Sequence, residues 1–255
     1  MTLRQCLLTH NDCYRAGRSI VPKGVCVHST GANNPRLSRY VAPDDGLLGP
    51  SSSRHWNQPG TTACVHAFIG QLADGSIATY QTLPWTIRGW HAGRGNRGTA
   101  NDTHISFEVC EDGLTDEGYF QAVYREAVEL TAHLCREFDL NPLADGVVIC
   151  HAEGYKRGIA SNHGDVLHWW PRFGKTMDDF RADVAREMRE DEPMSYEQWK
   201  QYMDRYMAER TELPENDWAR VKLQLARARG VTDGTRPQSF ATRQEVALMV
   251  NSAVK

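Results

Sequence analysis

The sequence predicts an α/β protein with a central mixed β-sheet flanked by helices, followed by a small helical domain. Short β-rich runs separated by turn signals alternate with segments of helical periodicity, a pattern typical of α/β domains. A charged stretch ending at Pro193 then changes the composition. We therefore expect a first domain over 1–190 and a small helical domain over 191–255.

Five runs of the first domain are strand-like. In 104–110, Ile105, Phe107 and Val109 alternate with polar residues, which predicts a strand with two different faces. Apolar residues at helical spacing predict helices over 116–138 and 177–188. The expected strands are 25–28, 64–69, 76–81, 104–110 and 147–150.

The second domain is predicted to contain only helices. Ser195 and Gln198 form a capping-box pattern, and further helices are expected over 217–230 and 242–250. Aromatic and methionine residues from Trp199 to Met207 recur at helical spacing. Packing within this module or on the first domain is the preferred interpretation of this stripe, and a homodimer interface is the alternative.

Composition narrows the range of partners. The net charge of −3 and a pI near 6.4 offer no basic excess for nucleic acid. No apolar run is long enough for membrane insertion, and the N-terminus lacks a secretory leader pattern, so synthesis in the cytoplasm is expected. The seven cysteines are scattered and include no CxxC pair, which argues against a disulfide framework and favours buried, reduced thiols.

Two of the ten histidines follow strand-like runs, where sheet enzymes commonly place their sites: His28 ends the first run and His151 follows the last. Catalytic zinc usually has about three protein ligands, and the segment after His151 offers His163 and Asp165. No HExxH motif occurs. Taken singly, a histidine is more often a hydrogen-bonded structural residue, so the residues alone make a zinc hydrolase one hypothesis. Ordinary structural roles are expected for His10, His55, His104, His133 and His168.

Four blocks of sequence carry a resemblance that covers about 20–185. They occur in order at 24–30, 65–75, 89–108 and 151–165. Together they resemble the type 2 N-acetylmuramoyl-L-alanine amidases, relatives of the peptidoglycan recognition proteins and of phage amidase endolysins. The resemblance implies a zinc ion held by His28, His151 and Asp165, with Glu108 activating a water molecule.

The resemblance also implies the other members of the site. The family often has a lysine two positions before its third ligand, close to the scissile carbonyl. This chain has His163 at that position. We therefore expect His163 to be the catalytic residue that donates a hydrogen bond to the oxyanion. Substrate-binding roles are implied for His66, Trp90 and His91; support of the metal ligands is the alternative for the two histidines, and an ordinary surface loop is the alternative for Trp90.

The implied reaction is hydrolysis of the amide between the lactyl group of N-acetylmuramic acid and L-alanine in bacterial peptidoglycan. Without a leader, the protein would reach the wall after release through a holin, as a phage endolysin does; a bacterial autolysin is the other origin. A non-catalytic peptidoglycan-binding module, a zinc peptidase acting on stem peptides and a helical adaptor are the alternative functions.

The segment 217–249 is similar to one surface-layer-homology-like module. Such modules usually bind secondary cell-wall polymers, often in threes. A single copy therefore predicts wall binding that depends on several copies acting together.

Overall fold

A computed structural model describes residues 1–190 and 194–254 of the chain. It divides into two compact units, Met1–Asp191 and Glu192–Lys255. Of the predicted linker over 189–193, residues 191–193 lie outside the described part. Among the described residues, no helix combines the length and the apolar character needed to cross a membrane.

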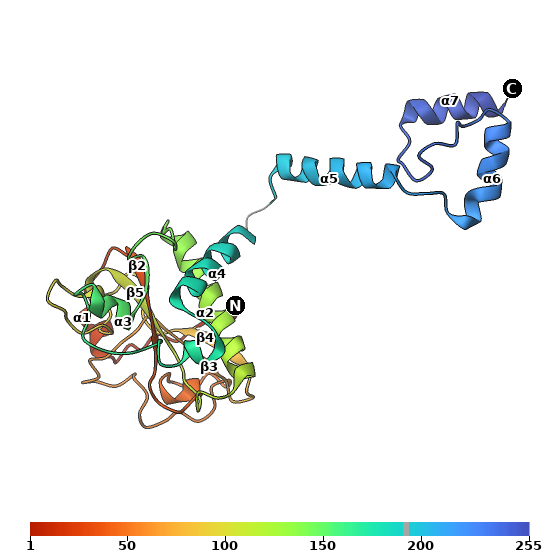
Figure 1. Ribbon diagram of the computed structural model, residues 1–255. Helices are drawn as coiled ribbons and strands as arrows, with labels where there is room; N and C mark the ends of the chain where they lie inside the picture. Colours follow the sequence, from red (N-terminus) through yellow and green to blue (C-terminus); the bar gives the residue numbers. More distant parts are fainter. Residues whose placement is uncertain (191–193, 255) are drawn as a thin grey trace. The chain divides into compact units, whose positions relative to one another are not determined.

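The first unit is built on a six-stranded mixed sheet (Figure 1). Strands β3 and β4 pair antiparallel, and the other neighbours in this sheet run parallel. The predicted mixed sheet is thus confirmed. In the order of the sheet, the strands are β1 (Leu3–Gln5), β4 (Ile77–Gln81), β3 (Ala67–Gln71), β5 (His104–Val109), β2 (Gly24–Ser29) and β6 (Val148–Cys150).

Two strands depart from the prediction. The residues of β1 are mostly polar and carry no apolar alternation, so this short edge strand was not expected. Strand β3 begins at Ala67 rather than at Cys64. Cys64 instead pairs with Trp90 in an isolated bridge, outside the sheet.

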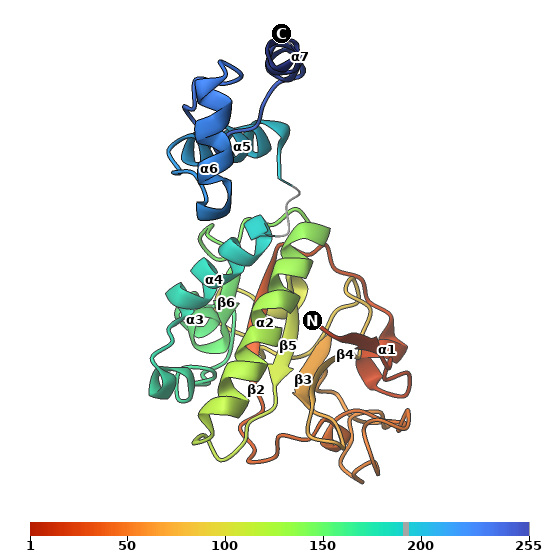
Figure 2. The ribbon, with the colours of Figure 1, turned by 90° about the vertical axis from the view of Figure 1, so that its right-hand side faces the viewer.

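The long helices α2 (Glu117–Glu137) and α4 (Met177–Glu190) cover one face of the sheet (Figure 2). The Asp116 side chain begins α2 by accepting a hydrogen bond from the Tyr119 amide. Between this layer and the sheet lies an apolar core that includes Ile105, Phe107 and Val109, the face expected from their alternation. The shorter helices are α1 (Asp12–Ala16), α3 (His151–Lys156) and the 3₁₀ turns Leu37–Arg39, Ala100–Asp102 and Trp170–Phe173.

The register of three parallel strands positions the polar residues at their ends. His28 on β2 lies opposite Glu108 on β5, and Val27 lies opposite Cys150 on β6. Since His151 directly follows Cys150, it enters α3 beside the end of β2. The sheet therefore brings His28, Glu108 and His151 to one edge.

The prediction that all the cysteines are reduced thiols is wrong for two of them. Cys13 on α1 and Cys64 form a disulfide with a Cα–Cα distance of 6.4 Å, within the usual range. Spacing could not reveal this pair, because 51 residues separate its members and only the fold brings them together. The other five cysteines are free, and four of them are buried, as expected for small apolar side chains.

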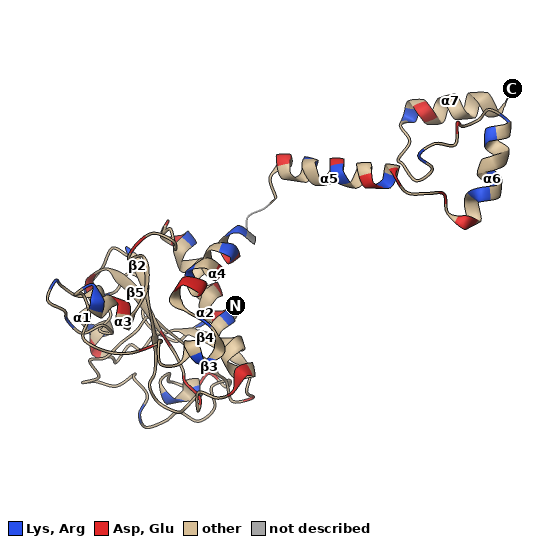
Figure 3. Cartoon of the chain, viewed as in Figure 1, with Lys and Arg blue, Asp and Glu red and all other residues tan. Residues whose placement is uncertain are grey.

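The second unit contains α5 (Tyr196–Thr211), α6 (Asp217–Ala228) and α7 (Arg243–Ala253). The capping box of Ser195 and Gln198 is present. Acidic and basic residues are interspersed along α5, whereas α6 has Asp217 at its start and only basic charged residues after it (Figure 3). None of the residues described in this unit is buried, and Trp199 and Tyr202 of the aromatic stripe are at least half exposed.

Candidate metal centre

Three predicted ligand residues meet at the carboxyl end of the parallel strands. His28 is buried at the end of β2, His151 begins α3, and Asp165 reaches both from the loop beyond α3. His28 Nδ1 lies 3.0 Å from Asp165 Oδ2 and 3.2 Å from His151 Nδ1. His151 Nδ1 lies 3.8 Å from Asp165 Oδ2. The structure thus brings together the three side chains that were far apart in the sequence.

This triangle fits a tetrahedral zinc ion. With ligand bonds of roughly 2.0–2.1 Å, two ligands of tetrahedral zinc are about 3.3–3.4 Å apart, close to the three distances observed. Burial and the neighbouring His28 lower the pKa of His151 to about 4, so the ring is neutral, the form that binds a metal. Two nitrogens and one carboxylate oxygen are also donors that zinc accepts. These residues therefore suit the metal.

The outer nitrogens of both histidines have partners. His28 Nε2 lies 2.9 Å from His91 Nδ1, and His151 Nε2 lies 3.3 Å from Ser161 Oγ. With each Nδ1 turned toward the centre of the triangle, each Nε2–H donates outward. His91 consequently accepts a hydrogen bond from the proposed ligand His28 and helps to orient its ring.

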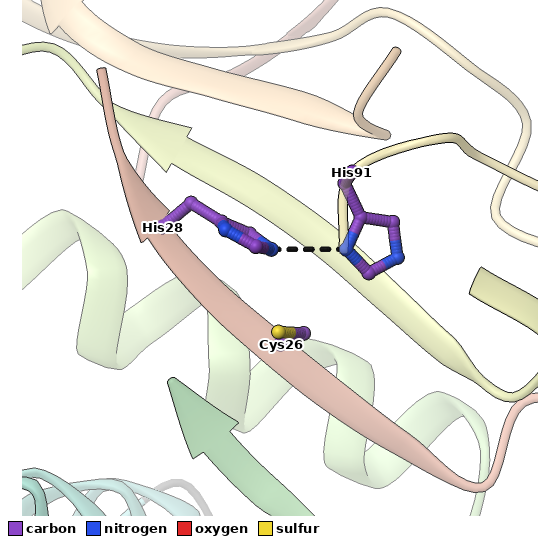
Figure 4. A group of neighbouring side chains, drawn as sticks. All are labelled: Cys26, His28 and His91. Atoms are coloured by element: carbon purple, nitrogen blue, oxygen red, sulfur yellow. Dashed lines mark hydrogen bonds between the residues drawn. The ribbon is translucent and has the colours of Figure 1, made fainter. Parts of the chain in front are cut away.

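Cys26, His28 and His91 form a second group whose ligand atoms lie within 4.8 Å of one another (Figure 4). Burial and the nearby acidic groups raise the pKa of the Cys26 thiol well above its usual value. A metal binds the thiolate, which this environment disfavours. The donors of His28, His151 and Asp165 are therefore the better metal site.

Glu108 lies beside the triangle. Its Oε2 is buried and has no hydrogen-bond partner among the described residues. Burial, with the charges of Asp165 and Glu111 next in importance, raises the pKa of Glu108 well above its usual value. A carboxyl group with a raised pKa in a cleft is suited to accept and return a proton near neutral pH.

A cavity of about 460 Å³ opens above these residues. His91 and the half-exposed Trp90, for which substrate contacts are expected, line it. His163 also lines it, with its ring centre 4.8 Å from that of His151. Within 1–190 and 194–254 the His163 ring makes no hydrogen bond, so both its nitrogens are available to a ligand.

His66 occupies a different place from the one predicted. Its side chain is fully buried; Nδ1 accepts a hydrogen bond from the Ser106 amide, and Nε2 donates to the Ile87 carbonyl. Burial lowers the pKa of His66 to about 4, which keeps the ring neutral. Because both nitrogens are used inside the protein, the geometry replaces the expected substrate contact with a structural role. The ring ties the start of β3 to β5.

Sequence reasoning missed His168, which was expected to be an ordinary structural histidine. It lines the cavity and pairs with Glu111. Its position three residues after Asp165 was the available signal, but an irregular loop has no periodicity from which a side-chain direction can be predicted.

The family model of N-acetylmuramoyl-L-alanine amidase matches residues 17–167, more than half of the chain. The chain belongs to the N-acetylmuramoyl-L-alanine amidase family. The matched region contains the proposed ligands and Glu108, and it ends before His168 and before the second unit.

Among relatives, the chain is 30% identical over 102 residues to N-acetylmuramoyl-L-alanine amidase XlyA of Bacillus subtilis (strain 168). This match covers 40% of the chain but only 29% of XlyA. The structure of the XlyA catalytic domain has a TM-score of 0.50 at 24% identity, covering 72% of this chain and 99% of that one. The structure of a mutant of PlyL has a TM-score of 0.51 at 20% identity with the same coverage. These two structures support the fold of the first unit.

Proposed function

We propose that the chain is a zinc-dependent N-acetylmuramoyl-L-alanine amidase. It would hydrolyse the amide between the lactyl group of N-acetylmuramic acid and L-alanine in peptidoglycan. The observation that carries the proposal is the triangle of His28, His151 and Asp165, which has zinc-like spacing and opens onto a cavity beside Glu108. Membership of the amidase family supports this choice of reaction.

Each residue of the site has a chemical role in this proposal. A zinc ion held by the triangle would supply a Lewis acid that activates water and polarises the scissile carbonyl. Glu108 accepts the proton of the attacking water and delivers one to the leaving amine. His163 donates a ring N–H to the oxyanion, a contribution of about 3–4 kcal/mol for a well-placed donor. Trp90 forms part of the wall against which the substrate rests.

The biological setting follows from the same proposal. A phage endolysin that reaches the wall after holin-dependent release is the preferred origin, and an autolysin is the second. The helical unit leaves Trp199, Tyr202 and Trp218 exposed within itself. Such side chains would be covered if the unit bound a secondary wall polymer or a second copy of the chain. Both interactions stay predictions.

The test is digestion of purified peptidoglycan followed by mass spectrometry of the products. We expect release of intact stem peptides with a free L-alanine amine, loss of this activity with a chelator, and recovery with zinc. His28→Ala should neither bind zinc nor cleave, because a ligand of the triangle is missing. Cleavage within the stem peptide would identify a peptidase instead. Activity indifferent to chelation would contradict the zinc-dependent mechanism.

A further inference from the structure

The cavity wall contains a hydrogen-bonded histidine–glutamate pair to which the proposed mechanism gives no contact with the substrate. His168 Nε2 lies 2.8 Å from Glu111 Oε1. The Glu111 side chain is only 5% exposed, whereas that of His168 is 39% exposed and lines the cavity. A buried carboxylate therefore stands directly behind an accessible ring.

Glu111 is itself fixed in place. It follows the end of β5 by two residues, and its amide donates to Thr30 Oγ1 at 3.1 Å. Its carbonyl accepts a hydrogen bond from the Asn34 amide at 2.8 Å. These bonds anchor Glu111 to the segment after β2, which contributes Thr30 to the same cavity.

Fold stability does not explain this pair. Removing a carboxylate from water is costly, and one partner at the surface repays little of that cost. An apolar residue at position 111 would serve the core at least as well. The hydrogen bond to Glu111 does, however, fix the direction of the His168 ring. The backbone of His168 is also held, because its carbonyl accepts a hydrogen bond from Arg172 Nε at 3.1 Å.

Most N–H donors of the cavity already have tasks. The Nε2 of His91 is buried without a hydrogen-bond partner among the described residues, but burial lowers the pKa of that ring well below its usual value, so it offers no positive charge. No lysine or arginine of the described chain lines the cavity. His28, His91 and His151 belong to the metal triangle and its outer hydrogen bond, and His163 is assigned to the oxyanion. The Nε2–H of His168 donates to Glu111, so Nδ1–H is left for a ligand when the ring carries both protons, and a ring in that form also brings a positive charge to an anionic group. The His168 ring is thus the remaining ionisable donor for an anionic group of the substrate.

We propose that His168, positioned by Glu111, binds a carboxylate of the stem peptide and so favours substrates in which that group is free. This inference rests on the proposed function, because it takes the peptide part of peptidoglycan as the ligand.

The first experiment measures binding without catalysis. Isothermal calorimetry compares a free stem peptide with the same peptide amidated at its side-chain and terminal carboxyls, each added to the zinc-loaded protein. Hydrogen bonds to charged groups predict that His168→Ala weakens binding of the free-acid peptide about 10- to 100-fold. Binding of the amidated peptide should stay unchanged. Equal affinity of wild type and His168→Ala for the free-acid peptide would overturn the proposal.

Glu111→Gln tests the positioning role, since the amide oxygen can still accept the His168 N–H. We expect a smaller loss than in His168→Ala, confined to the same peptide. His168→Ala and Glu111→Gln should both retain zinc. Loss of zinc from either variant would show that His168 and Glu111 support the metal site, and this result would overturn the proposal. The matched control is His133→Ala, which removes another surface histidine paired with a glutamate, Glu137, at 3.3 Å on α2.

Steady-state kinetics on soluble muramoyl peptides test the role of His168 separately from the proposed amidase function. His168→Ala should raise KM for the free-acid substrate and leave kcat unchanged. A fall in kcat that is equal for both substrates would indicate a catalytic role and overturn the specificity role. A wild-type protein that binds the free-acid peptide through His168 but cleaves neither substrate would refute the amidase function alone.

Discussion

At His28 the two ring nitrogens have different tasks. Nδ1 faces His151 and Asp165, while Nε2 faces His91 at 2.9 Å. A neutral imidazole carries one proton, so donation to His91 leaves the Nδ1 lone pair free for a metal. One hydrogen bond thereby selects the tautomer that the proposed chemistry needs.

Glu108→Gln tests the proposed proton transfer. The amide cannot accept a proton, so kcat should fall by a factor of about 10²–10⁴, the usual contribution of a general acid–base group. Zinc binding should persist, because Glu108 is not one of the three ligands. The measurements are kcat on a soluble muramoyl peptide and metal content by mass spectrometry.

The companion variant is Asp165→Ala, which should lose both zinc and activity. If Glu108→Gln kept full kcat, Glu108 would not be the base. If it lost its zinc as readily as Asp165→Ala, Glu108 would have to be counted among the ligands.

At the scale of elements, the site depends on β2 lying between β5 and β6. This order places a ligand on β2, the base on the neighbouring β5, and a second ligand directly after the end of β6, the neighbour on the other side. Parallel strands share the direction of their carboxyl ends, so polar residues that end such strands gather at one edge. The loop after α3 then closes the site with Asp165.

The Cys13–Cys64 disulfide joins α1 to the segment before β3, and Cys64 pairs with Trp90 of the cavity wall. Closing a loop of 51 residues restricts the unfolded chain and stabilises the fold by up to about 4 kcal/mol in the chain-entropy model. We predict that dithiothreitol lowers the free energy of urea unfolding by an amount approaching this value.

Cys13→Ser/Cys64→Ser is the matched variant. It should unfold at the lower urea concentration with or without dithiothreitol. An unfolding midpoint of the wild type that is the same in both conditions would show that the disulfide is absent or contributes nothing.

At the scale of the whole molecule, stability and chemistry are concentrated in the first unit. The three apolar clusters and all the residues of the metal centre lie within 1–190, whereas no described residue of the second unit is buried. Since apolar burial dominates folding, the first unit has what it needs to fold alone.

We predict that a chain ending at residue 190 folds cooperatively, binds one zinc ion and cleaves soluble muramoyl peptides with the kcat and KM of the full chain. Thermal unfolding by circular dichroism and kinetics on the two proteins in parallel are the measurements. A truncated chain that is unfolded or free of zinc would mean that the second unit completes the first.

The sequence determined the α/β class, the two long helices and the blocks that carry the family resemblance. Alternation in 104–110 and helical spacing in 116–138 are local patterns, and the structure confirms β5 and α2 there. His28 and His151 could be suspected because each stands at the end of a strand-like run. These features depend on neighbours in the chain, which is why they can be predicted from it.

Tertiary structure alone decided the rest. It paired Cys13 with Cys64, moved His66 into the interior and turned His168 toward the cavity in front of Glu111. It also brought Asp165 to within 3.0 Å of a histidine 137 positions earlier. Contacts between distant residues depend on strand order and on irregular loops. Neither leaves a period in the sequence. The family resemblance could therefore name His28, His151 and Asp165, but only the fold shows that these side chains meet and which two of the seven cysteines pair.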